Sequence, residues 1–328
     1  MSVNSINNFP ESTKILKLDK PFVLIDVGAR RGFHPVFNNF NPVLKIGFEP
    51  NEQECSLLDS NKSDDSERYF PVGLGSKHEE RKFYNAKNPG SSGIFPPNVK
   101  YWSRFAESDS LDLVSEDIIK TEPLDSFLQE MDIKDCDFLK IDTEGFEQHI
   151  IDGGKQIITS NVLGVLTEVY FNPVREGGAK FGDICNTLDA CGLSLYELSP
   201  SKICKKTYLI DKKNTIKPDS IGQLVWGDAV FLRDPMKDTD SDLYRWDLDK
   251  YKKLISLYEI FNLNDCAYEL VFYLEDKDLL TAIEIETLKK LFLNKPIKNK
   301  FLNYLYGNYP SLLGIVPHKL RKILRKII

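Results

Sequence analysis

A short apolar run that leads directly into a glycine-bounded turn constrains the fold of this chain more than any other feature. Residues 22–27 read FVLIDV and are followed by Gly28-Ala29-Arg30-Arg31-Gly32. A run this short and this apolar is typical of a parallel strand that is buried on both faces. Gly28 permits a tight turn, and Gly32 would let a following helix pack close to the strand. The segment therefore predicts the start of a β-α-β unit.

Similar apolar runs alternate with segments of helical periodicity along the chain. Further strands are expected at residues 43–48, 69–72, 137–141, 162–167, 193–198 and 227–232, and helices at 52–60, 124–131, 146–153 and 181–191. Residues 81–95 are expected to form a hairpin around Asn88-Pro89-Gly90. This alternation predicts an α/β fold with a mostly parallel, Rossmann-like sheet and helices on both of its faces.

The length of the chain indicates more than one domain. Its 328 residues exceed the roughly 100–200 residues of a usual single domain. Asp234-Pro235 and the polar residues 237–242 look like a linker, and residues 243–293 have helical periodicity. We therefore expect an N-terminal flank at 1–20, the main domain at 21–235 and a helical extension at 236–328.

Composition excludes several classes of protein. Hydrophobic residues make up 41% and charged residues 28% of the chain, which is ordinary for a globular protein. The first residues contain no apolar run of signal-peptide length, and nothing approaches the roughly 18 apolar residues of a spanning helix. The six cysteines form no C-x-x-C pair and the four histidines have no zinc-site spacing. A cytoplasmic protein with reduced thiols and no zinc is expected.

Charge is distributed unevenly along the chain. The formal net charge is −6, but residues 298–328 hold seven Lys and Arg and no acid, so the remainder carries −13. An acidic body of this kind argues against nucleic-acid binding.

The basic end of the chain is expected to form an amphipathic helix. Leu320, Ile323, Leu324 and Ile327 fall on one helical face, and five Lys and Arg occupy the others. Residues 312–328 could lie in the interface of an anionic membrane, or could pack on the protein itself or on a second copy in a homo-oligomer. The membrane alternative predicts that the full chain co-sediments with anionic liposomes in a salt-sensitive way and that a version ending at Gly314 does not. Equal sedimentation of the two would exclude it.

The first turn also suggests which cofactor the sheet binds. In open α/β sheets, ligands bind beyond the carboxyl ends of the strands. The turn lacks the middle glycine that lets the backbone approach a pyrophosphate, so S-adenosylmethionine fits better than a dinucleotide. Glu49, 23 residues after Asp26, ends the second strand, where it can accept hydrogen bonds from both ribose hydroxyls. A nucleotide-dependent oxidoreductase is the alternative enzyme.

Four segments resemble the FkbM family of methyltransferases. They are IDVGARRG (25–32), GFEPN (47–51), DFLKIDTEGFEQHIIDGG (137–154) and LTEV (166–169). The string K-I-D-x-E-G-x-E at residues 140–147 is the most diagnostic. The resemblance spans most of residues 20–235 and does not reach 236–328.

The resemblance implies a class I methyltransferase sheet and methyl transfer to oxygen, often on sugars or other natural products. The acceptor would then be a small molecule or a glycan. Arg30-Arg31 departs from the smaller residues expected there, which could narrow the choice of substrate. A non-catalytic binding subunit with the same fold is the alternative from another class. The residues expected to contact the cofactor are Asp26, Gly28, Ala29, Arg30, Gly32, Glu49, Pro50, Asn51, Gly73, Leu74 and Asp142.

Acidic residues are expected to meet where methyl transfer would occur. Asp142 and Glu168 end neighbouring predicted strands, and Glu144 lies in the turn beside them. One of them could be a general base, or Asp142 and Glu168 could hold Mg²⁺ that orients and acidifies a sugar diol. His34 is a further candidate base. Glu147 is expected only to cap the following helix.

Overall fold

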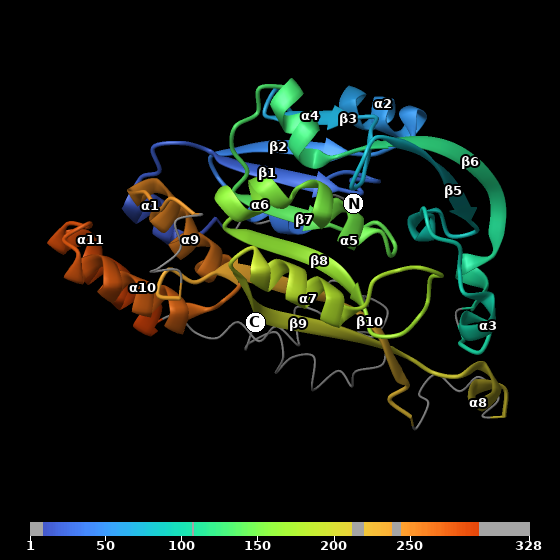
Figure 1. Ribbon diagram of the computed structural model, residues 1–328. Coiled ribbons are helices and arrows are strands. Elements are labelled where there is room, and N and C mark those ends of the chain that lie inside the picture. The colour runs from blue at the N-terminus through green and yellow to red at the C-terminus, as the bar shows by residue number, and fades with distance from the viewer. Residues whose placement is uncertain (1–8, 107, 212–219, 238–243, 295–328) are drawn as a thin grey trace. The chain divides into compact units, whose positions relative to one another are not determined.

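The computed structural model describes residues 9–106, 108–211, 220–237 and 244–294 (Figure 1). Contacts divide the chain into two compact units, one that includes Leu18–Leu254 and one that combines Pro10–Lys17 with the chain from Ile255 onward. All residues predicted for the site belong to the first unit. The predicted basic helix at 312–328 lies outside the described residues.

A seven-stranded sheet forms the centre of the first unit. Its strands are β1 (Phe22–Val27), β2 (Val43–Phe48), β3 (Glu67–Phe70), β7 (Phe138–Ile141), β8 (Gly164–Tyr170), β9 (Leu193–Ile203) and β10 (Gln223–Arg233). Their order is β3-β2-β1-β7-β8-β10-β9, and only β10 runs antiparallel to its neighbours. Strand order reverses at β1, which pairs with β2 on one side and β7 on the other. A ligand site is expected beyond the carboxyl ends of these strands.

Helices cover both faces of this sheet, as expected. One face carries α4 (Leu124–Glu130), α5 (Glu147–Gly153), α6 (Lys155–Ser160) and α7 (Phe181–Ala190). Figure 1 shows α5, α6 and α7 lying along that face, where Ile141, Val165 and Phe231 belong to one buried core. On the other face a short 3-10 helix, η1 (Pro35–Asn39), packs Phe37 against Phe138. Helix α2 (Glu52–Ser60) connects β2 to β3.

A second, three-stranded sheet corrects the prediction of a hairpin at 81–95. The sheet has the order β4-β6-β5, with β4 at Gly73–Leu74, β5 at Glu79–Ala86 and β6 at Leu113–Glu122. Strand β5 pairs along its length with β6, and within 81–95 the two predicted arms share only an isolated bridge between Tyr84 and Gly93. The tip, Pro89–Ser91, is a 3-10 turn, η2.

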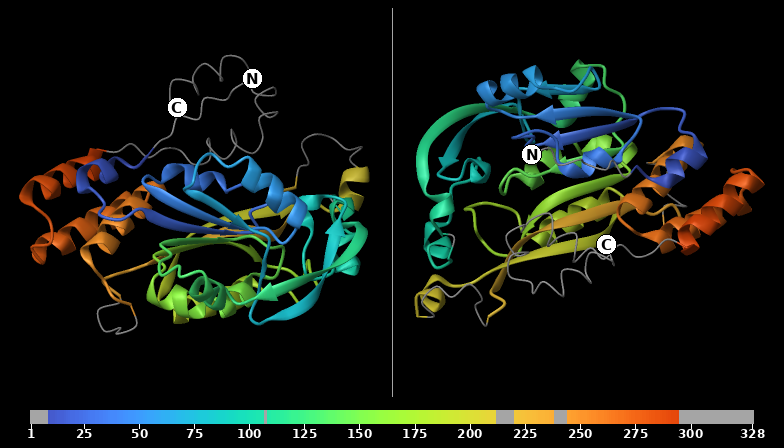
Figure 2. Two further views of the ribbon diagram at one scale, coloured as in Figure 1. Left: turned by 90° about the horizontal axis from the view of Figure 1, so that it is seen from above. Right: turned by 180° about the vertical axis from the view of Figure 1, so that it is seen from behind.

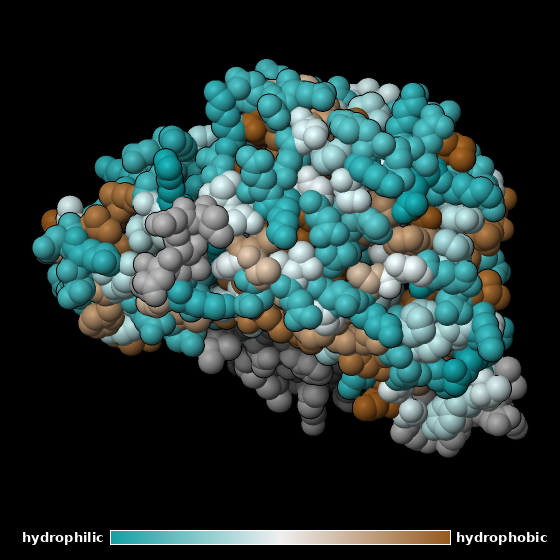
Figure 3. All heavy atoms as spheres, viewed as in Figure 1, coloured by the Kyte–Doolittle hydropathy of each residue, from teal (hydrophilic) through white to brown (hydrophobic). Residues whose placement is uncertain are grey.

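Exposure explains why β6 carries no recognisable strand pattern. Leu113, Val114 and Ile118 are exposed, and most other residues of β6 are exposed too. Figure 2 shows β5 and β6 as a curved ribbon beside the main sheet, and Figure 3 shows scattered apolar residues on an otherwise mainly hydrophilic face. A pair of strands that is exposed to solvent on both faces has no alternation of apolar and polar residues that would reveal it in the sequence.

An aromatic cluster lies where β8 ends beside the first residues of β10. Trp102, Phe105, Tyr170 and Val225 are buried together. The helix α3 (Val99–Trp102) contributes Trp102 and η3 (Ser108–Leu111) contributes Leu111, and the short helix α8 (Lys206–Asp211) follows β9.

The second unit is helical, as predicted for the C-terminal part. It contains α1 (Glu11–Leu16), α10 (Asn264–Asp276), α11 (Ala282–Asn294) and the end of α9 (Leu248–Ile260). The Glu259 carboxylate accepts the N–H groups of Glu11 and Ser12 at 2.8 and 2.9 Å, which satisfies the first turn of α1. Within the described ranges, no helix has the length and apolar character that crossing a bilayer requires.

Candidate active site

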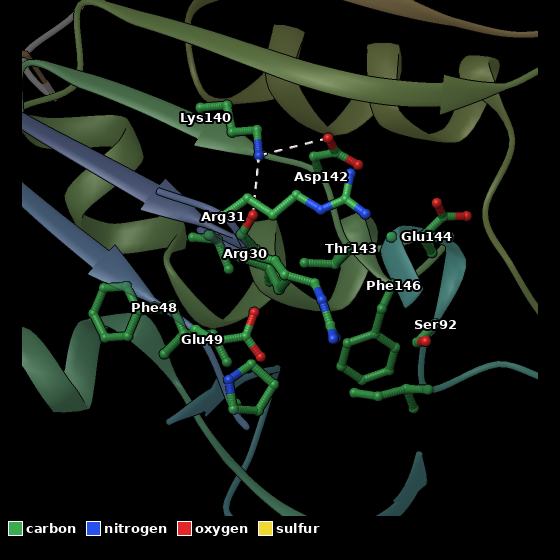
Figure 4. Close-up of a pocket in the computed structure, with 18 of the residues that line it drawn as sticks. Arg30, Arg31, Phe48, Glu49, Ser92, Lys140, Asp142, Thr143, Glu144 and Phe146 are labelled. Carbon is green, nitrogen blue, oxygen red and sulfur yellow. Dashed lines mark hydrogen bonds and ion pairs between the residues drawn. The ribbon is translucent and has the colours of Figure 1, made fainter. Parts of the chain in front are cut away.

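A cavity of about 400 Å³ opens beyond the carboxyl ends of β1, β2 and β7 (Figure 4). The turns after these strands form one wall, and the tip between β5 and β6 forms another. Most of the residues predicted from the sequence line it, namely Gly28, Arg30, Gly32, His34, Glu49, Pro50, Gly73, Leu74, Asp142 and Glu144. The predicted residues that do not line it are Asp26, Ala29, Asn51 and Glu168.

Glycine is required at position 28 for two independent reasons. Its φ of +85° lies in the left-handed region, and a Cβ there would be 2.1 Å from the carbonyl oxygen of Asp142. The N–H groups of Gly28 and Ala29 both donate to the carbonyl of Phe48, at 3.1 and 3.0 Å. The turn is thereby fixed between the ends of β2 and β7, and Ala29 acts through its backbone from behind the cavity.

The role predicted for Gly32 is corrected. The 3-10 helix η1 follows it in place of an α-helix, and the nearest atom to a Cβ at Gly32 would be the Tyr69 hydroxyl at 4.0 Å. Close helix packing therefore does not require glycine here. Glycine is instead required by the backbone conformation, because φ at this residue is +100°.

Asp26 supports the cavity from behind rather than lining it. It is fully buried, and its carboxylate lies 3.0 Å from the Lys140 ammonium and accepts the His34 N–H at 2.8 Å. Burial raises the pKa of Asp26, against the lowering effect of Lys140. The carboxylate therefore fixes the path of the first turn and the position of Lys140.

Lys140 is a site residue for which the sequence analysis gave no role. Its ammonium also lies 3.5 Å from the Asp142 carboxylate and donates to the carbonyl of Gly28 at 3.3 Å. Burial acts to lower its pKa, but Asp26 and Asp142 outweigh it, so the pKa is raised and the side chain stays cationic. Lys140 thus joins the turn after β1 to the turn after β7, as the dashed lines in Figure 4 show.

Glu49 lies in the cavity wall with one carboxylate oxygen engaged. Its Oε1 accepts the N–H of Asn51 at 2.9 Å, and no hydrogen bond within the described part of the chain engages Oε2. Burial raises the pKa of Glu49, whereas the Asn51 N–H and the charge of Arg30 lower it. Asn51 itself caps α2 by accepting the N–H of Glu54, so its side chain serves the helix.

The acidic turn after β7, residues 142–147, has side chains of two kinds. Some hold the turn in place, and others face the cavity. Glu147 accepts the N–H groups of Thr143 and Gly145 at 2.9 and 3.0 Å, so it holds the turn before α5, and the capping role expected for it is corrected because no side chain caps the start of that helix. Burial raises the pKa of Glu147 to about 7. The Asp142 side chain, in contrast, is 46% exposed and faces the cavity, which leaves it open to a ligand.

Glu168 does not end its strand, because β8 continues to Tyr170 and pairs Glu168 with Asp228 of β10. The carboxyl group is buried, and its Oε2 has no hydrogen-bond partner in the described structure. Burial, with the charges of Glu144 and Asp142, raises its pKa well above the usual range. Burial therefore favours the protonated form of Glu168, which lies behind the acidic turn.

His34 lines the cavity as a neutral ring. Burial, with the charge of Lys140, lowers its pKa to about 4. Its Nδ1 accepts the N–H of Val36 at 3.3 Å, which places the proton on Nε2. A ring in this tautomer donates at its other nitrogen, so His34 is better suited to hydrogen-bond an oxygen than to remove its proton.

We expect His34 to make the fold sensitive to acid. Its folded pKa lies below its unfolded value of about 6.5, so the unfolded state binds the proton first and stability is lost as pH falls from 6.5 through 4. At pH 4.5 the wild type should lose about 2 kcal/mol more than His34→Asn, which keeps an acceptor for Val36. Urea unfolding at pH 7 and 4.5 measures this difference. Parallel losses in the two proteins would contradict it.

Arg175, to which the sequence analysis also gave no role, contacts three segments of the site and holds them together. Its guanidinium donates to the Glu144 carboxylate at 2.8 Å and to the carbonyls of Ser91 and Phe95. The Tyr170 hydroxyl donates to the same Glu144 oxygen at 3.0 Å. Burial raises the pKa of Glu144 and Arg175 opposes this effect. Glu144 is therefore held in place, and the tip between β5 and β6 is tied to the acidic turn.

Removing the Arg175 guanidinium should destabilise the protein strongly. Arg175→Leu leaves the Glu144 carboxylate buried without its cation, and we expect unfolding free energy to fall by about 3–5 kcal/mol. Adding Glu144→Gln to this variant removes the unpaired negative charge and should restore part of the lost unfolding free energy. Thermal and urea unfolding of the single and double variants measure both effects. A double variant no more stable than Arg175→Leu alone would contradict the pairing.

The acids do not assemble a metal site in the part of the chain that the structure describes. No three His, Cys, Asp or Glu side chains there are grouped so that they could hold a metal ion. Of the two residues predicted to bind Mg²⁺, Asp142 lies beside the Lys140 ammonium and Glu168 is away from the cavity.

Solved structures that resemble this chain share little sequence with it. Solved structures that resemble it include the magnesium protoporphyrin IX methyltransferase of Synechocystis PCC 6803 with bound SAM (8% identical, TM-score 0.33, covering 65% of this chain and 71% of that one). Another is the methyltransferase FkbM of Methylobacillus flagellatus KT (13% identical, TM-score 0.33, covering 66% of this chain and 50% of that one). A third is a putative S-adenosylmethionine-dependent methyltransferase of Listeria monocytogenes (8% identical, TM-score 0.36, covering 68% of this chain and 96% of that one).

The family assignment rests on the sequence. The comparison with curated proteins finds no match. The model of the methyltransferase FkbM domain matches residues 26–195, which include the turn after β1, Glu49 and the acidic turn after β7. This match covers more than half of the chain, and the chain belongs to the FkbM family of S-adenosylmethionine-dependent methyltransferases.

Proposed function

We propose that this chain transfers a methyl group from S-adenosylmethionine to a hydroxyl oxygen of a sugar or glycan. One observation carries the proposal: a single cavity presents both the Glu49 and the Asp142 carboxylates (Figure 4). The first carboxylate suits a ribose, and the second suits the hydroxyl that is to be methylated.

The cavity fits the cofactor on grounds of donor chemistry and space. Oε2 of Glu49 is open to a ribose hydroxyl, and the cavity volume of about 400 Å³ lies in the range of small-molecule sites. Arg30 occupies the position where a dinucleotide-binding turn requires glycine next to a pyrophosphate, which disfavours the oxidoreductase alternative. When bound, S-adenosylmethionine supplies an electrophilic methyl group.

Asp142 is the side chain best placed to receive the acceptor's proton. It faces the cavity and is half exposed, whereas Glu144 is held by Arg175 and Tyr170 and Glu168 does not line the cavity. Lys140 fixes the Asp142 carboxylate at 3.5 Å. A carboxylate that is held in this way can orient a hydroxyl and remove its proton as the oxygen attacks.

The alternative in which Mg²⁺ activates the hydroxyl would require a rearrangement of the site. The metal would need oxygen ligands beyond Asp142, and Glu168 would have to turn toward the cavity and lose its proton. Lys140 already supplies a positive charge next to Asp142. The proposed reaction therefore proceeds without a metal.

Methyl transfer to a panel of free and nucleotide-activated sugars tests the proposal. The assay follows release of S-adenosylhomocysteine, and nuclear magnetic resonance of the product identifies the methylated atom. The proposal predicts a new O-methyl group and no release when the acceptor hydroxyl is absent. A product methylated on nitrogen or carbon would contradict oxygen as the acceptor atom.

A further inference from the structure

Two adjacent arginines in the cavity are not used by the proposed reaction. Arg30 and Arg31 both line it, and Figure 4 shows the Arg30 side chain reaching between Glu49 and Phe146 and the Arg31 side chain reaching toward Asp142. Among the described residues neither guanidinium makes a hydrogen bond or an ion pair. By contrast, Lys140 is paired with Asp26 and Arg175 with Glu144.

The backbone at Arg31 is in a conformation that disfavours most residues other than glycine. Its φ is +69°, in the left-handed region, where glycine or asparagine fits at lower cost. The Arg31 N–H is fixed by the Glu54 carboxylate at 3.2 Å, and this backbone directs the side chain across the cavity. Strained positions of this kind concentrate at ligand-binding sites.

The charges of the site balance before any ligand is bound. Among the side chains that line the cavity, the carboxylates of Glu49, Asp142 and Glu144 equal in number the cations of Arg30, Arg31 and Lys140. S-adenosylmethionine adds a sulfonium, an ammonium and only one carboxylate. The loaded site therefore has one positive charge in excess, and the cofactor's carboxylate can neutralise only one of the two arginines.

We propose that Arg31 binds a negatively charged oxygen group, a carboxylate or phosphate, on the acceptor of the methyl group. Arg31 rather than Arg30 is assigned because it reaches toward Asp142, where the acceptor hydroxyl must lie, whereas Arg30 reaches toward the ribose-binding Glu49. A guanidinium can bind such groups through two parallel hydrogen bonds. The acceptor is then an acidic or phosphorylated sugar, a deduction that rests on the proposed function.

Binding measurements on the whole protein test Arg31 without knowledge of the acceptor. The probes are S-adenosylhomocysteine, 5′-methylthioadenosine, which lacks the amino and carboxyl groups, and inorganic phosphate added to protein loaded with S-adenosylhomocysteine at constant ionic strength. The proteins are the wild type, Arg31→Gln and Arg104→Gln, since Arg104 is exposed and remote from the cavity lining. Phosphate binding is followed by line broadening of its phosphorus resonance.

We expect Arg31→Gln to weaken phosphate binding about tenfold or more while both nucleosides bind as in the wild type. Arg104→Gln should change nothing. Loss of S-adenosylhomocysteine affinity in Arg31→Gln with unchanged 5′-methylthioadenosine affinity would assign Arg31 to the cofactor's carboxylate and overturn the proposal. So would a loaded wild type that binds no phosphate, or phosphate binding that Arg31→Gln leaves intact.

Failure of the proposed function gives a different result. If the cofactor is wrong, S-adenosylhomocysteine does not bind the wild type, and if the acceptor atom is wrong, the sugar panel gives a product methylated on nitrogen or carbon. A later competition experiment separates the two sources of the anion, a carboxylate and a phosphate. It compares glucose, glucuronate and glucose 6-phosphate as competitors of inorganic phosphate. Glucose is expected not to compete.

Discussion

Replacing Glu49 with alanine should weaken binding of S-adenosylhomocysteine by about tenfold to more than a hundredfold. The carboxylate lies in the cavity wall with Oε2 open, and the loss of hydrogen bonds to a charged group costs about 1.5–3 kcal/mol. Isothermal titration calorimetry measures the change directly. Glu49→Gln should be intermediate, because the amide keeps one acceptor oxygen and loses the charge.

Glu52 provides a matched control for this prediction. It is an exposed acid three residues further on, in the first turn of α2, and it does not line the cavity. Glu52→Ala should bind the nucleoside like the wild type. If a folded Glu49→Ala protein binds equally tightly, the ribose assignment is wrong.

Replacing Asp142 with asparagine should lower turnover by about 10²–10⁴-fold and change cofactor affinity little. The substitution keeps the shape of the side chain and removes its capacity to accept a proton, which is the size of effect that general-base removal produces. Turnover is measured by release of S-adenosylhomocysteine with an acceptor found in the sugar panel, and affinity by calorimetry.

Glu168→Gln separates the two carboxyl groups that the sequence alone treated as equivalent. Because Glu168 does not line the cavity and burial raises its pKa, which favours the protonated form, its amide analogue should retain most of the turnover. Asp65→Asn, at an exposed position outside the cavity, serves as a surface control. Loss of turnover in Glu168→Gln with an active Asp142→Asn would reverse the assignment. Inhibition by a chelator that Mg²⁺ restores would reinstate the metal.

The buried parts of the fold were predictable because burial leaves a pattern in the sequence. The strands β1, β2 and β7 are short apolar runs, and their predicted and observed bounds agree within a residue. Strand β6 was missed because it is exposed along most of its length. The end of β8 was placed too early, since Glu168 looks like a terminus although Val169 and Tyr170 continue the strand.

The site was predictable where spacing alone determines position. The cavity brings together Gly28, Glu49 and Asp142, each from a turn that follows a predicted strand. Lys140 could have been found, because a lysine inside the buried run FLKI requires a nearby anion. Arg175 could not, because it lies in a polar loop and its partners are 31 to 84 residues away in the chain.

Titration of the wild-type protein with S-adenosylhomocysteine and, separately, with NADPH tests the central claim most directly. A site built from Glu49, the Gly28 turn and Asp142 predicts that one S-adenosylhomocysteine binds per chain and that NADPH does not bind. A protein that binds NADPH and shows no heat with S-adenosylhomocysteine would contradict the account.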